Sequence, residues 1–334
     1  MKKILVTGGA GFIGSYLVNK LIKKNYDVMV VDHLKTIGGI PYIHPRCFFV
    51  KGDILMPETL AKIKKWKPEI IYHLAAQSAG ESAYDNPKFD YLVNGYGSYL
   101  LSELAKEIKV KHLIYSSSVA VYGSNIKNKI TEKSKIKPDS IYGISKYAGE
   151  MFIQQVLGPT NVKTTIFRIF NTYGPGENLN FLKKGMISIY CSYVWKNKPI
   201  IVKGSLKRFR NYQYIDDVVN ILFKTIKNKS LAKNEIFNLS SGVYTTVNSL
   251  IKLILKIKNK PNHKIIVKKQ GTPGDSFGFH ASNNYLKKKF NNYKFFSLEE
   301  GLIKYFKWIN SVPYKKNLNY FHPLRQVYYK NINL

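Results

Sequence analysis

Three side chains have the chemistry to move a proton to or from a hydroxyl group: Ser118, Tyr142 and Lys146. A tyrosine phenol has an ordinary pKa near 10 and is a poor base at neutral pH. Lys146 follows Tyr142 by four residues, so both lie on one face of a predicted helix, where the ammonium group would favour the phenolate. Ser118, at the end of a predicted strand, would bond the same oxygen. The pattern predicts general acid–base catalysis, with a chance surface pair as the alternative.

A glycine-rich turn near the start of the chain predicts a dinucleotide site. Gly8, Gly11 and Gly14 lie between a predicted strand and a predicted helix. They allow a tight turn, close approach of the backbone to a pyrophosphate, and an N-terminal helix end that faces the phosphates. Asp32, 18 residues after Gly14, ends the next predicted strand. A carboxylate there would bond ribose hydroxyls and repel a 2′-phosphate, which favours NAD over NADP; an ordinary loop is the alternative.

Short apolar runs alternate with amphipathic stretches through the first half of the chain. We expect strands at 3–7, 27–32, 47–51, 70–74, 112–116 and 163–170, and helices at 14–24, 57–65, 88–108 and 144–157. Strands rich in β-branched residues and separated by helices are typical of a parallel sheet covered on both faces. The sequence therefore predicts an α/β fold, with a Rossmann doubly wound parallel sheet and a smaller mixed α/β domain.

The expected domain boundaries follow from where this regular pattern ends. The dinucleotide-binding domain is expected over 1–170, with a returning segment at about 205–242. Clusters of Gly, Pro and Asn separate short elements in 171–204 and 243–313, which we expect to form a substrate-binding domain that closes over the carboxyl edge of the sheet. A basic, aromatic C-terminal extension occupies 314–334, and we expect it to pack on the chain itself or on a partner subunit.

Several further segments occur in an order that resembles the extended short-chain dehydrogenase/reductase family, the nucleotide-sugar epimerases and dehydratases. They are Gly-x-x-Gly-x-x-Gly at 8–14, Gly-Asp-Ile at 52–54, His-Leu-Ala-Ala-Gln at 73–77, Asn94, Ser-Ser-Ser at 116–118, Val-Tyr-Gly at 121–123, Tyr-x-x-x-Lys at 142–146, the segment 168–175, Arg210 ahead of 214–217, and Pro-Gly-Asp at 273–275. The resemblance runs from residue 3 to about 309, and within the family the pattern is similar to the 4-epimerases.

The resemblance implies which residues bind NAD. Tyr142 and Lys146 would do so in addition to their role in proton transfer, with Lys146 holding the ribose. The other expected cofactor-binding residues are Gly8, Gly11, Phe12, Ile13, Gly14, Asp32, Asp53, Ile54, Leu74, Ala75, Ala76, Asn94 and Ser116. The seven histidines show no metal-binding spacing, so no metal is expected.

The residues after Ser118 narrow the reaction that the resemblance implies. The 4,6-dehydratases of the family carry an Asp-Glu pair there, and decarboxylating members keep the glutamate. Val119 and Ala120 occupy these positions and cannot transfer protons. The resemblance thus implies an NDP-hexose 4-epimerase that acts through a transient 4-keto sugar, with Ser118, Tyr142 and Lys146 as catalytic residues. A 4-dehydrogenase or ketoreductase with net redox would use the same residues and stays open.

The same resemblance implies how a nucleotide-sugar diphosphate would be held. Ser118 and Tyr142 would contact the sugar, Asn171 and Arg210 the phosphates, and Asp275 the ribose of the nucleotide. Phe279 matches a gate position at which a large side chain excludes an N-acetyl group, with core packing as the alternative.

Three positions depart from the 4-epimerase pattern and leave the particular hexose and nucleotide open. Thr272 stands where the epimerases have an arginine, for which Lys268 or Lys269 would compensate. Ser78 lies near the position of a lysine, and Gly185 near that of an asparagine.

Charge is the most unusual property of the composition. The 334 residues include 53 basic and 20 acidic side chains, a formal charge of +33. Only five of the basic residues are arginine, the residue favoured for bidentate contacts to phosphates and bases, so we expect lysine-rich surfaces and no nucleic-acid partner. No apolar stretch of about 18 residues occurs, so we expect no membrane partner. A non-catalytic NAD-binding protein recruited to an anionic partner is the alternative from another functional class.

Two further expectations concern the setting of the protein. Cys47 and Cys191 show neither a disulfide framework nor a zinc pattern, which indicates a reducing compartment and thus the cytoplasm. Members of the family commonly dimerise through the helices that we expect at 88–108 and 144–157, so the resemblance implies a homodimer.

Overall fold

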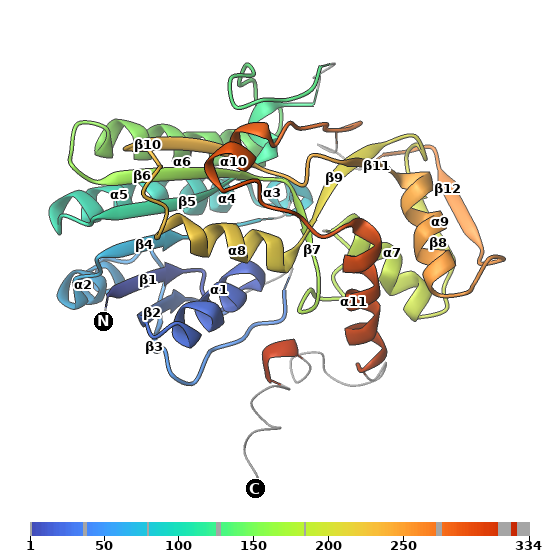
Figure 1. Cartoon of the computed structure of the whole chain (residues 1–334), viewed down its shortest axis with the longest axis horizontal. Helices are drawn as coiled ribbons and strands as arrows, with labels where there is room; N and C mark the ends of the chain where they lie inside the picture. Colours follow the sequence, from blue (N-terminus) through green and yellow to red (C-terminus); the bar gives the residue numbers. More distant parts are fainter. Residues whose placement is uncertain are drawn as a thin grey trace, which may run out of the picture.

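The computed structural model describes residues 2–35, 39–78, 80–124, 128–183, 185–271, 276–312 and 322–325. A larger part, built around one extended sheet, is joined to a smaller part that carries short strands and helices (Figure 1). Asp275, Thr272 and most of the C-terminal extension lie outside the described residues.

The larger part contains a seven-stranded sheet in the order β10-β6-β5-β4-β1-β2-β3. Every neighbouring pair of these strands is parallel. The strands are β1 (Lys3–Thr7), β2 (Asp27–Asp32), β3 (Phe48–Lys51), β4 (Ile70–His73), β5 (His112–Ser118), β6 (Lys163–Ile169) and β10 (Asn234–Leu239). The strand order reverses between β1 and β4, and a crevice for ligands is expected at the carboxyl ends of strands at such a point. The predicted fold class is confirmed.

Helices cover both faces of this sheet. They are α1 (Phe12–Lys23), α2 (Pro57–Trp66), α5 (Gly97–Glu107), α6 (Ile141–Leu157) and α8 (Ile215–Thr225). Alternate residues of β1 point to opposite faces: Ile4 and Val6 join the core cluster that contains α1 and α8, whereas Leu5 joins the cluster that contains α2, α5 and α6. This alternation explains why the strands are apolar without interruption.

The helix predicted at 88–108 is divided into three pieces. It consists of α4 (Pro87–Tyr91), a π-helical segment Leu92–Tyr96, and α5. A further short helix, α3 (Gly80–Asp85), precedes it and was not predicted. The π-helical segment carries Asn94, whose side chain bonds three different segments, as described below.

The smaller part is built from two small sheets and several helices. One sheet has the order β11-β9-β7, with β7 (Asn171–Tyr173), β9 (Phe209–Tyr214) and β11 (Tyr244–Thr246), and the other pairs β8 (Ile200–Lys203) with β12 (Ile265–Lys268). The helices are α7 (Met186–Trp195), α9 (Val247–Ile257), α10 (Asn284–Lys289) and α11 (Leu298–Asn310). The returning segment therefore contributes β10 to the large sheet and β9 to a small one.

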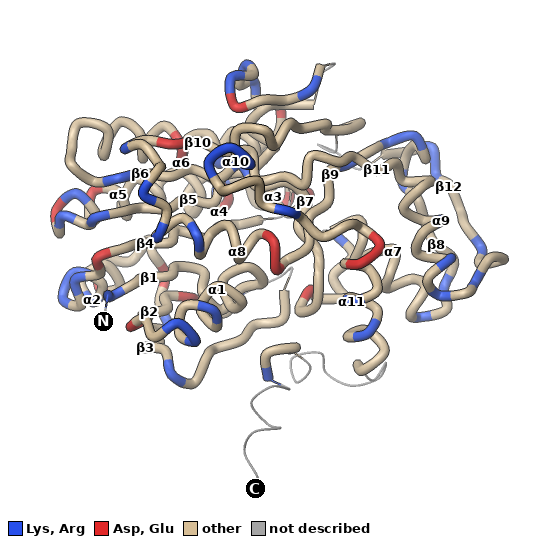
Figure 2. The backbone as a smooth tube through the Cα atoms, viewed as in Figure 1, with Lys and Arg blue, Asp and Glu red and all other residues tan. Residues whose placement is uncertain are grey.

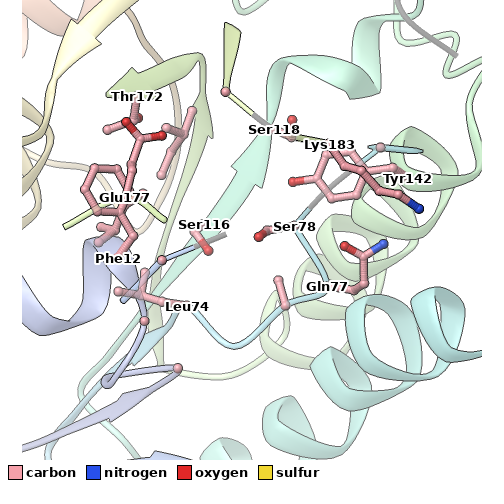
Figure 3. A pocket seen from close by; sticks show the side chains of 18 of the residues that line it. Phe12, Leu74, Gln77, Ser78, Ser116, Ser118, Tyr142, Thr172, Glu177 and Lys183 are labelled. Carbon is pink, nitrogen blue, oxygen red and sulfur yellow. The ribbon is translucent and has the colours of Figure 1, made fainter. Parts of the chain in front are cut away.

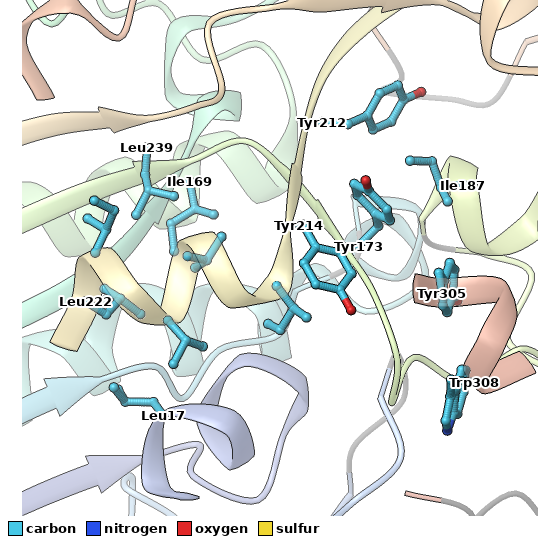
Figure 4. Close-up of a cluster of buried hydrophobic side chains, with 14 of the residues drawn as sticks. Leu17, Ile169, Tyr173, Ile187, Tyr212, Tyr214, Leu222, Leu239, Tyr305 and Trp308 are labelled. Carbon is cyan, nitrogen blue, oxygen red and sulfur yellow. The ribbon is translucent and has the colours of Figure 1, made fainter. Parts of the chain in front are cut away.

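One apolar cluster runs through both parts of the molecule. Figure 4 shows Leu17 and Leu222 from the helices of the large sheet near Tyr214, and Tyr305 and Trp308 beyond it. The rings of Tyr173 and Tyr214 lie 5.7 Å apart at their centroids. Because the two parts share this core, the crevice between them has packed walls on both sides.

Charged residues are spread along the surface of both parts. Lysines and arginines recur on elements as distant as α2 and β12, whereas acidic residues are sparse (Figure 2). Among the described helices, none combines the length and apolar character that a bilayer crossing requires.

Candidate functional site

A cavity of about 510 Å³ lies at the carboxyl edge of the large sheet. Its lining begins at the glycine-rich turn after β1, continues past the ends of β4 and β5, and reaches Lys203, Arg208 and Arg210 in the smaller part. Figure 3 shows side chains from both parts pointing into it. The cavity therefore has a sheet half, at the predicted dinucleotide turn, and a second half formed by the smaller part.

The glycine-rich turn lines the sheet half of the cavity, directly after β1. Gly8 has a φ of +69°, and a Cβ there would come within 2.6 Å of the backbone nitrogen of Ala75. A Cβ on Gly14 would lie 2.2 Å from the carbonyl oxygen of Gly8. Helix α1 begins after Gly11 without a side-chain cap, so its first N–H groups are available to an anion. Both glycines are thus required for the turn to approach β4 and α1 this closely.

Asp32 ends β2 at the rim of the same half. Its carboxylate accepts hydrogen bonds from the backbone N–H of Ala10 at 3.0 Å and of Leu34 at 2.8 Å. These two bonds fix the orientation of the carboxylate, and each oxygen keeps a lone pair for another donor. The side chain lines the cavity although the residue is only 8% exposed.

Nearly all of the predicted cofactor residues line the cavity. These are Gly8, Gly11, Phe12, Ile13, Gly14, Asp32, Asp53, Ile54, Leu74, Ala75, Ala76, Ser116, Tyr142 and Lys146. Asn94 does not, because its amide lies behind the wall, where it donates to the carbonyl of Gln77 at 3.1 Å and to Ser145 Oγ at 3.0 Å. Asn94 therefore supports the wall of the cavity through Gln77 and Ser145, and its contact with the cofactor stays a prediction.

Ser118, Tyr142 and Lys146 come together where the two halves of the cavity meet. Ser118 ends β5 and caps a short 3-10 helix, Val119–Tyr122. Tyr142 lies in the first turn of α6, which Ser140 caps by accepting a hydrogen bond from the N–H of Gly143 at 3.1 Å. The Ser118 hydroxyl lies close enough to the Tyr142 phenol to lower its pKa, and Figure 3 shows the two side chains on the same side of the cavity. Lys146 lies one helical turn further along α6.

Burial has a large effect on the pKa values of this group. Burial raises the pKa of Tyr142 to about 12, although the hydrogen bond from Ser118 lowers it. Burial also lowers the pKa of Lys146 to about 7, against the attraction of Asp90 and Glu150. The Lys146 ammonium lies 4.4 Å from the centroid of the Tyr115 ring. Burial is therefore the largest influence on the pKa of both groups, and it favours the neutral form of each.

Asp90 is a member of this group that the sequence analysis missed. It is fully buried, and its carboxylate accepts hydrogen bonds from Ser145 Oγ and from Asn94 Nδ2, the latter at 3.3 Å. Its negative charge raises the pKa of Lys146. The available signal was its position four residues before Asn94, which places both side chains on one side of the helical stretch.

The predicted phosphate ligands lie in the second half of the cavity. Asn171 lines it and donates from Nδ2 to the carbonyl of Asn211 at 3.2 Å. The guanidinium of Arg210 is held by the carbonyls of Phe209, Phe277 and Ser276, at 2.7, 3.1 and 2.7 Å. These bonds leave Arg210 rigid at the cavity wall.

Phe279 does not line the cavity. Its ring packs against the cluster that includes Val121 and Phe170, and it lies 5.6 Å from the Arg210 guanidinium carbon. The alternative of core packing therefore fits Phe279 in this structure, and its role as a gate stays a prediction.

Two basic residues line this half that the sequence analysis did not choose. Lys203 ends β8, and Arg208 immediately precedes β9. Arg208 is 8% exposed and still borders the cavity. Lys268 and Lys269, which were expected to compensate for Thr272, do not line it. Only the folding of β8 and β9 shows that Arg208 and Arg210 reach the same cavity.

The two positions after Ser118 carry no carboxylate. Val119 lines the cavity at the position after Ser118, and neither it nor Ala120 can transfer a proton. Glu177 also lines the cavity, but Figure 3 shows it beside Thr172 and Phe12, across from Tyr142. The described residues contain no group of three or more side chains suited to hold a metal ion.

Comparisons with known proteins agree with this geometry. The model of the NAD dependent epimerase/dehydratase family matches residues 4–240. A protein of Methanocaldococcus jannaschii, provisionally named UDP-glucose 4-epimerase, is 35% identical over 252 residues, which are 75% of this chain and 81% of the relative. The UDP-glucose 4-epimerase of Mycolicibacterium smegmatis is 30% identical over 74% of this chain and 80% of its own. The structure of UDP-glucose 4-epimerase with UDP-glucose from Thermotoga maritima is 32% identical, covers 92% of this chain and 99% of its own, and has a TM-score of 0.86.

Proposed function

This chain belongs to the NAD-dependent epimerase/dehydratase family, and on that basis we propose that it is an NDP-hexose 4-epimerase that acts through a transient 4-keto sugar. The observation that carries the proposal is the group formed by Ser118, Tyr142 and Lys146 at the junction of the two halves of one cavity. Val119 and Ala120 in place of acidic residues support oxidation at one carbon over dehydration.

The sheet half fits NAD. The uncapped N-terminus of α1 and the close approach allowed by Gly8 and Gly14 suit a pyrophosphate, and the fixed carboxylate of Asp32 suits a ribose diol. NAD, when bound there, supplies the hydride acceptor and its positively charged ring. That charge would favour the phenolate of Tyr142.

The protein's part in the reaction is to move one proton and hold one oxygen. Tyr142, as the phenolate, would take the proton of the sugar 4-hydroxyl when C4 is oxidised and would return it when the 4-keto group is reduced on its other face. Ser118 holds the same sugar oxygen by a hydrogen bond. Asp90, as a buried counter-charge, favours the protonated form of Lys146, and that ammonium group would in turn favour the phenolate. No net oxidation results from a full cycle.

The second half of the cavity fits the diphosphate of a nucleotide sugar. Arg208 and Arg210 line it as buried cations, and Asn171 adds an amide. The 4-epimerases have an arginine at the position of Thr272. We propose that Arg208 contacts the diphosphate instead of that arginine. Asp275, the proposed ligand of the nucleotide ribose, lies outside the described residues.

The Arg208→Gln variant is expected to bind UDP and UDP-sugars about tenfold to a hundredfold more weakly, because a hydrogen bond to a charged group contributes roughly 1.5–3 kcal/mol. Isothermal titration of UDP into the protein measures this. The control is Lys207→Gln, which removes the same charge from an exposed neighbouring residue. Equal losses in both variants would show that only the general field of the protein matters.

The proposed function is tested by incubating the protein and NAD with UDP-, GDP-, CDP- and dTDP-hexoses. Product NMR should show one C4 epimer pair, and absorbance at the NADH band should stay constant during turnover. Accumulating NADH with a released keto sugar would instead establish the net 4-oxidoreductase. Absence of turnover with every sugar would contradict both.

We also propose that the chain forms a homodimer through α5 and α6. Apolar side chains on and beside these helices are exposed, among them Ile144 at 53% and Met151 at 47%. Light scattering should give a mass of twice 38.4 kDa, and Met151→Lys should shift it toward the monomer; a monomeric wild type would refute the proposal.

A further inference from the structure

The described part of the C-terminal extension, residues 322–325, packs against the beginning of α1. The His322 ring is fully buried, and Leu324 is 8% exposed. The ring stacks on Tyr42, with the centroids 4.7 Å apart and the planes at 9°, and lies 6.1 Å from the ring of Tyr16. A buried aromatic stack of this kind stabilises the contact between the segments by more than the burial of apolar area alone would.

Hydrogen bonds determine which nitrogen of His322 carries the proton. Nδ1 lies 3.2 Å from the backbone N–H of Leu324 and accepts its hydrogen bond, so Nε2 carries the hydrogen and faces Ser15 Oγ at 3.3 Å. Ser15 in turn donates from its hydroxyl to the carbonyl of Phe12 at 3.1 Å. Burial lowers the pKa of His322 to about 3, so the ring is neutral at physiological pH, as these partners require. A chain of hydrogen bonds therefore runs from the extension to the first residue of α1.

His322 also contacts two segments that cover the sheet half of the cavity. Tyr42 belongs to a segment whose Ile40 N–H donates to the Gly176 carbonyl at 2.8 Å. Gly39 and Glu177 form a β-bridge, and both line the cavity. A Cβ on Gly176 would lie 3.4 Å from His322 Nε2, so the ring is packed directly against this pairing.

These segments enclose the turn at which a dinucleotide would be held. A Cβ on Gly39 would lie 3.0 Å from the Cβ of Phe12, so segment 39–42 lies directly over the start of α1. The backbone N–H of Tyr42 donates to the carbonyl of Ala10 at 3.0 Å. Separation of segment 39–42 from residues 174–177 would open this side of the cavity, and the buried His322 ring opposes that separation.

We infer that His322 is a positioning residue for the dinucleotide turn, which holds Phe12 and the segment 39–42 in place and slows release of the cofactor. The inference rests on the proposed binding of NAD. It assigns a task to the extension, which lies beyond the part of the chain that resembles the epimerases.

The test compares the rate at which NAD dissociates from wild type and from His322→Ala. Dissociation of labelled NAD into an excess of unlabelled NAD should be at least about tenfold faster in the variant, the factor that corresponds to the loss of about 1.4 kcal/mol. His322→Gln, whose side-chain amide can still donate to Ser15, should recover part of the difference. The control is His263→Ala, a half-buried histidine of the smaller part that contacts the carbonyl of Lys198 at 2.9 Å and should leave the rate unchanged.

A second measurement does not depend on bound cofactor. Hydrogen exchange of the backbone amides of residues 10–16 and 39–44 should be faster in His322→Ala without NAD, and unchanged in His263→Ala. Unchanged exchange and an unchanged NAD rate in a folded His322→Ala would overturn the inference. If wild type binds no NAD at all, the proposed function fails, and exchange alone then decides whether His322 positions the turn.

If His322→Ala does not fold, the same measurements are made on Ser15→Ala. This variant removes only the hydroxyl that links the His322 ring to the carbonyl of Phe12. Faster exchange at residues 10–16 in Ser15→Ala is the expected result. Exchange and NAD dissociation equal to those of wild type would again overturn the inference.

Discussion

Tyr142→Phe is expected to bind NAD as wild type does and to lose sugar turnover by about a hundredfold to ten-thousandfold, the usual contribution of a positioned acid–base group. The substitution removes one oxygen and keeps the ring that lines the cavity. Without that oxygen, the sugar hydroxyl loses the base that the proposed mechanism assigns to it, and Val119 and Ala120 after Ser118 cannot take its place.

Turnover of the accepted nucleotide sugar, followed by NMR, measures the effect. The control is Tyr147→Phe, which removes a phenol oxygen from the same helix at a half-buried residue that does not line the cavity. It should leave turnover within a factor of about two, since surface changes outside a site have small effects. Turnover by Tyr142→Phe at the wild-type rate would exclude the proposed mechanism, whichever sugar is used.

Arg168→Met is expected to lower the free energy of unfolding by about 3–5 kcal/mol, because it leaves a buried charge without its partner. Arg168 and Glu150 are 3% and 1% exposed. The guanidinium donates to both carboxylate oxygens of Glu150, at 3.0 and 2.7 Å, and to the Tyr122 hydroxyl at 2.9 Å. Glu150 also accepts a hydrogen bond from Ser117, next to Ser118, the proposed catalytic residue, so the loss should reach the site.

Urea unfolding followed by circular dichroism measures the change. The double variant Arg168→Met, Glu150→Leu should recover much of the loss, because replacing both partners of a buried ion pair leaves no unpaired charge. Lys111→Met serves as the control, since it breaks the exposed pair with Glu69, with Nζ and Oε2 2.6 Å apart, and should cost at most about 1 kcal/mol. An Arg168→Met loss as small as that of Lys111→Met would show that the buried pair contributes little.

The elements that local sequence specifies were predictable to within a few residues. The strands expected at 3–7 and 27–32 are β1 and β2 with the same bounds. An unbroken apolar run is stable when it is buried on both faces of a sheet, so the polar residues at its ends mark the ends of the strand. The prediction of one regular helix at 88–108 was wrong, because a π-helical segment divides it. Its π-helical segment holds Asn94 against Gln77 and Ser145, and such distant contacts leave no trace in helical periodicity.

The candidate site was predictable where its residues are close in the chain or follow a strand. Gly8, Gly11 and Gly14 belong to one turn, and Tyr142 and Lys146 to one helical face, so spacing alone places them together. The pKa values of these two residues could not be predicted from their spacing. Spacing predicts that Lys146 lies near Tyr142, but burial, which raises one pKa and lowers the other, depends on all the segments packed around α6.

Sequence therefore determined the layered fold, the dinucleotide turn and the reactive group, because each depends on neighbouring residues or on the common edge at which parallel strands end. Tertiary structure alone placed Asp90, Arg208 and His322 where the roles proposed for them require them to be. His322 and Ser15 are separated by 307 residues, and Arg208 reaches the cavity only because β8 and β9 fold against the large sheet. Burial and contact between distant segments set the charge states and the closure of this site, and both arise only when the whole chain packs into one core.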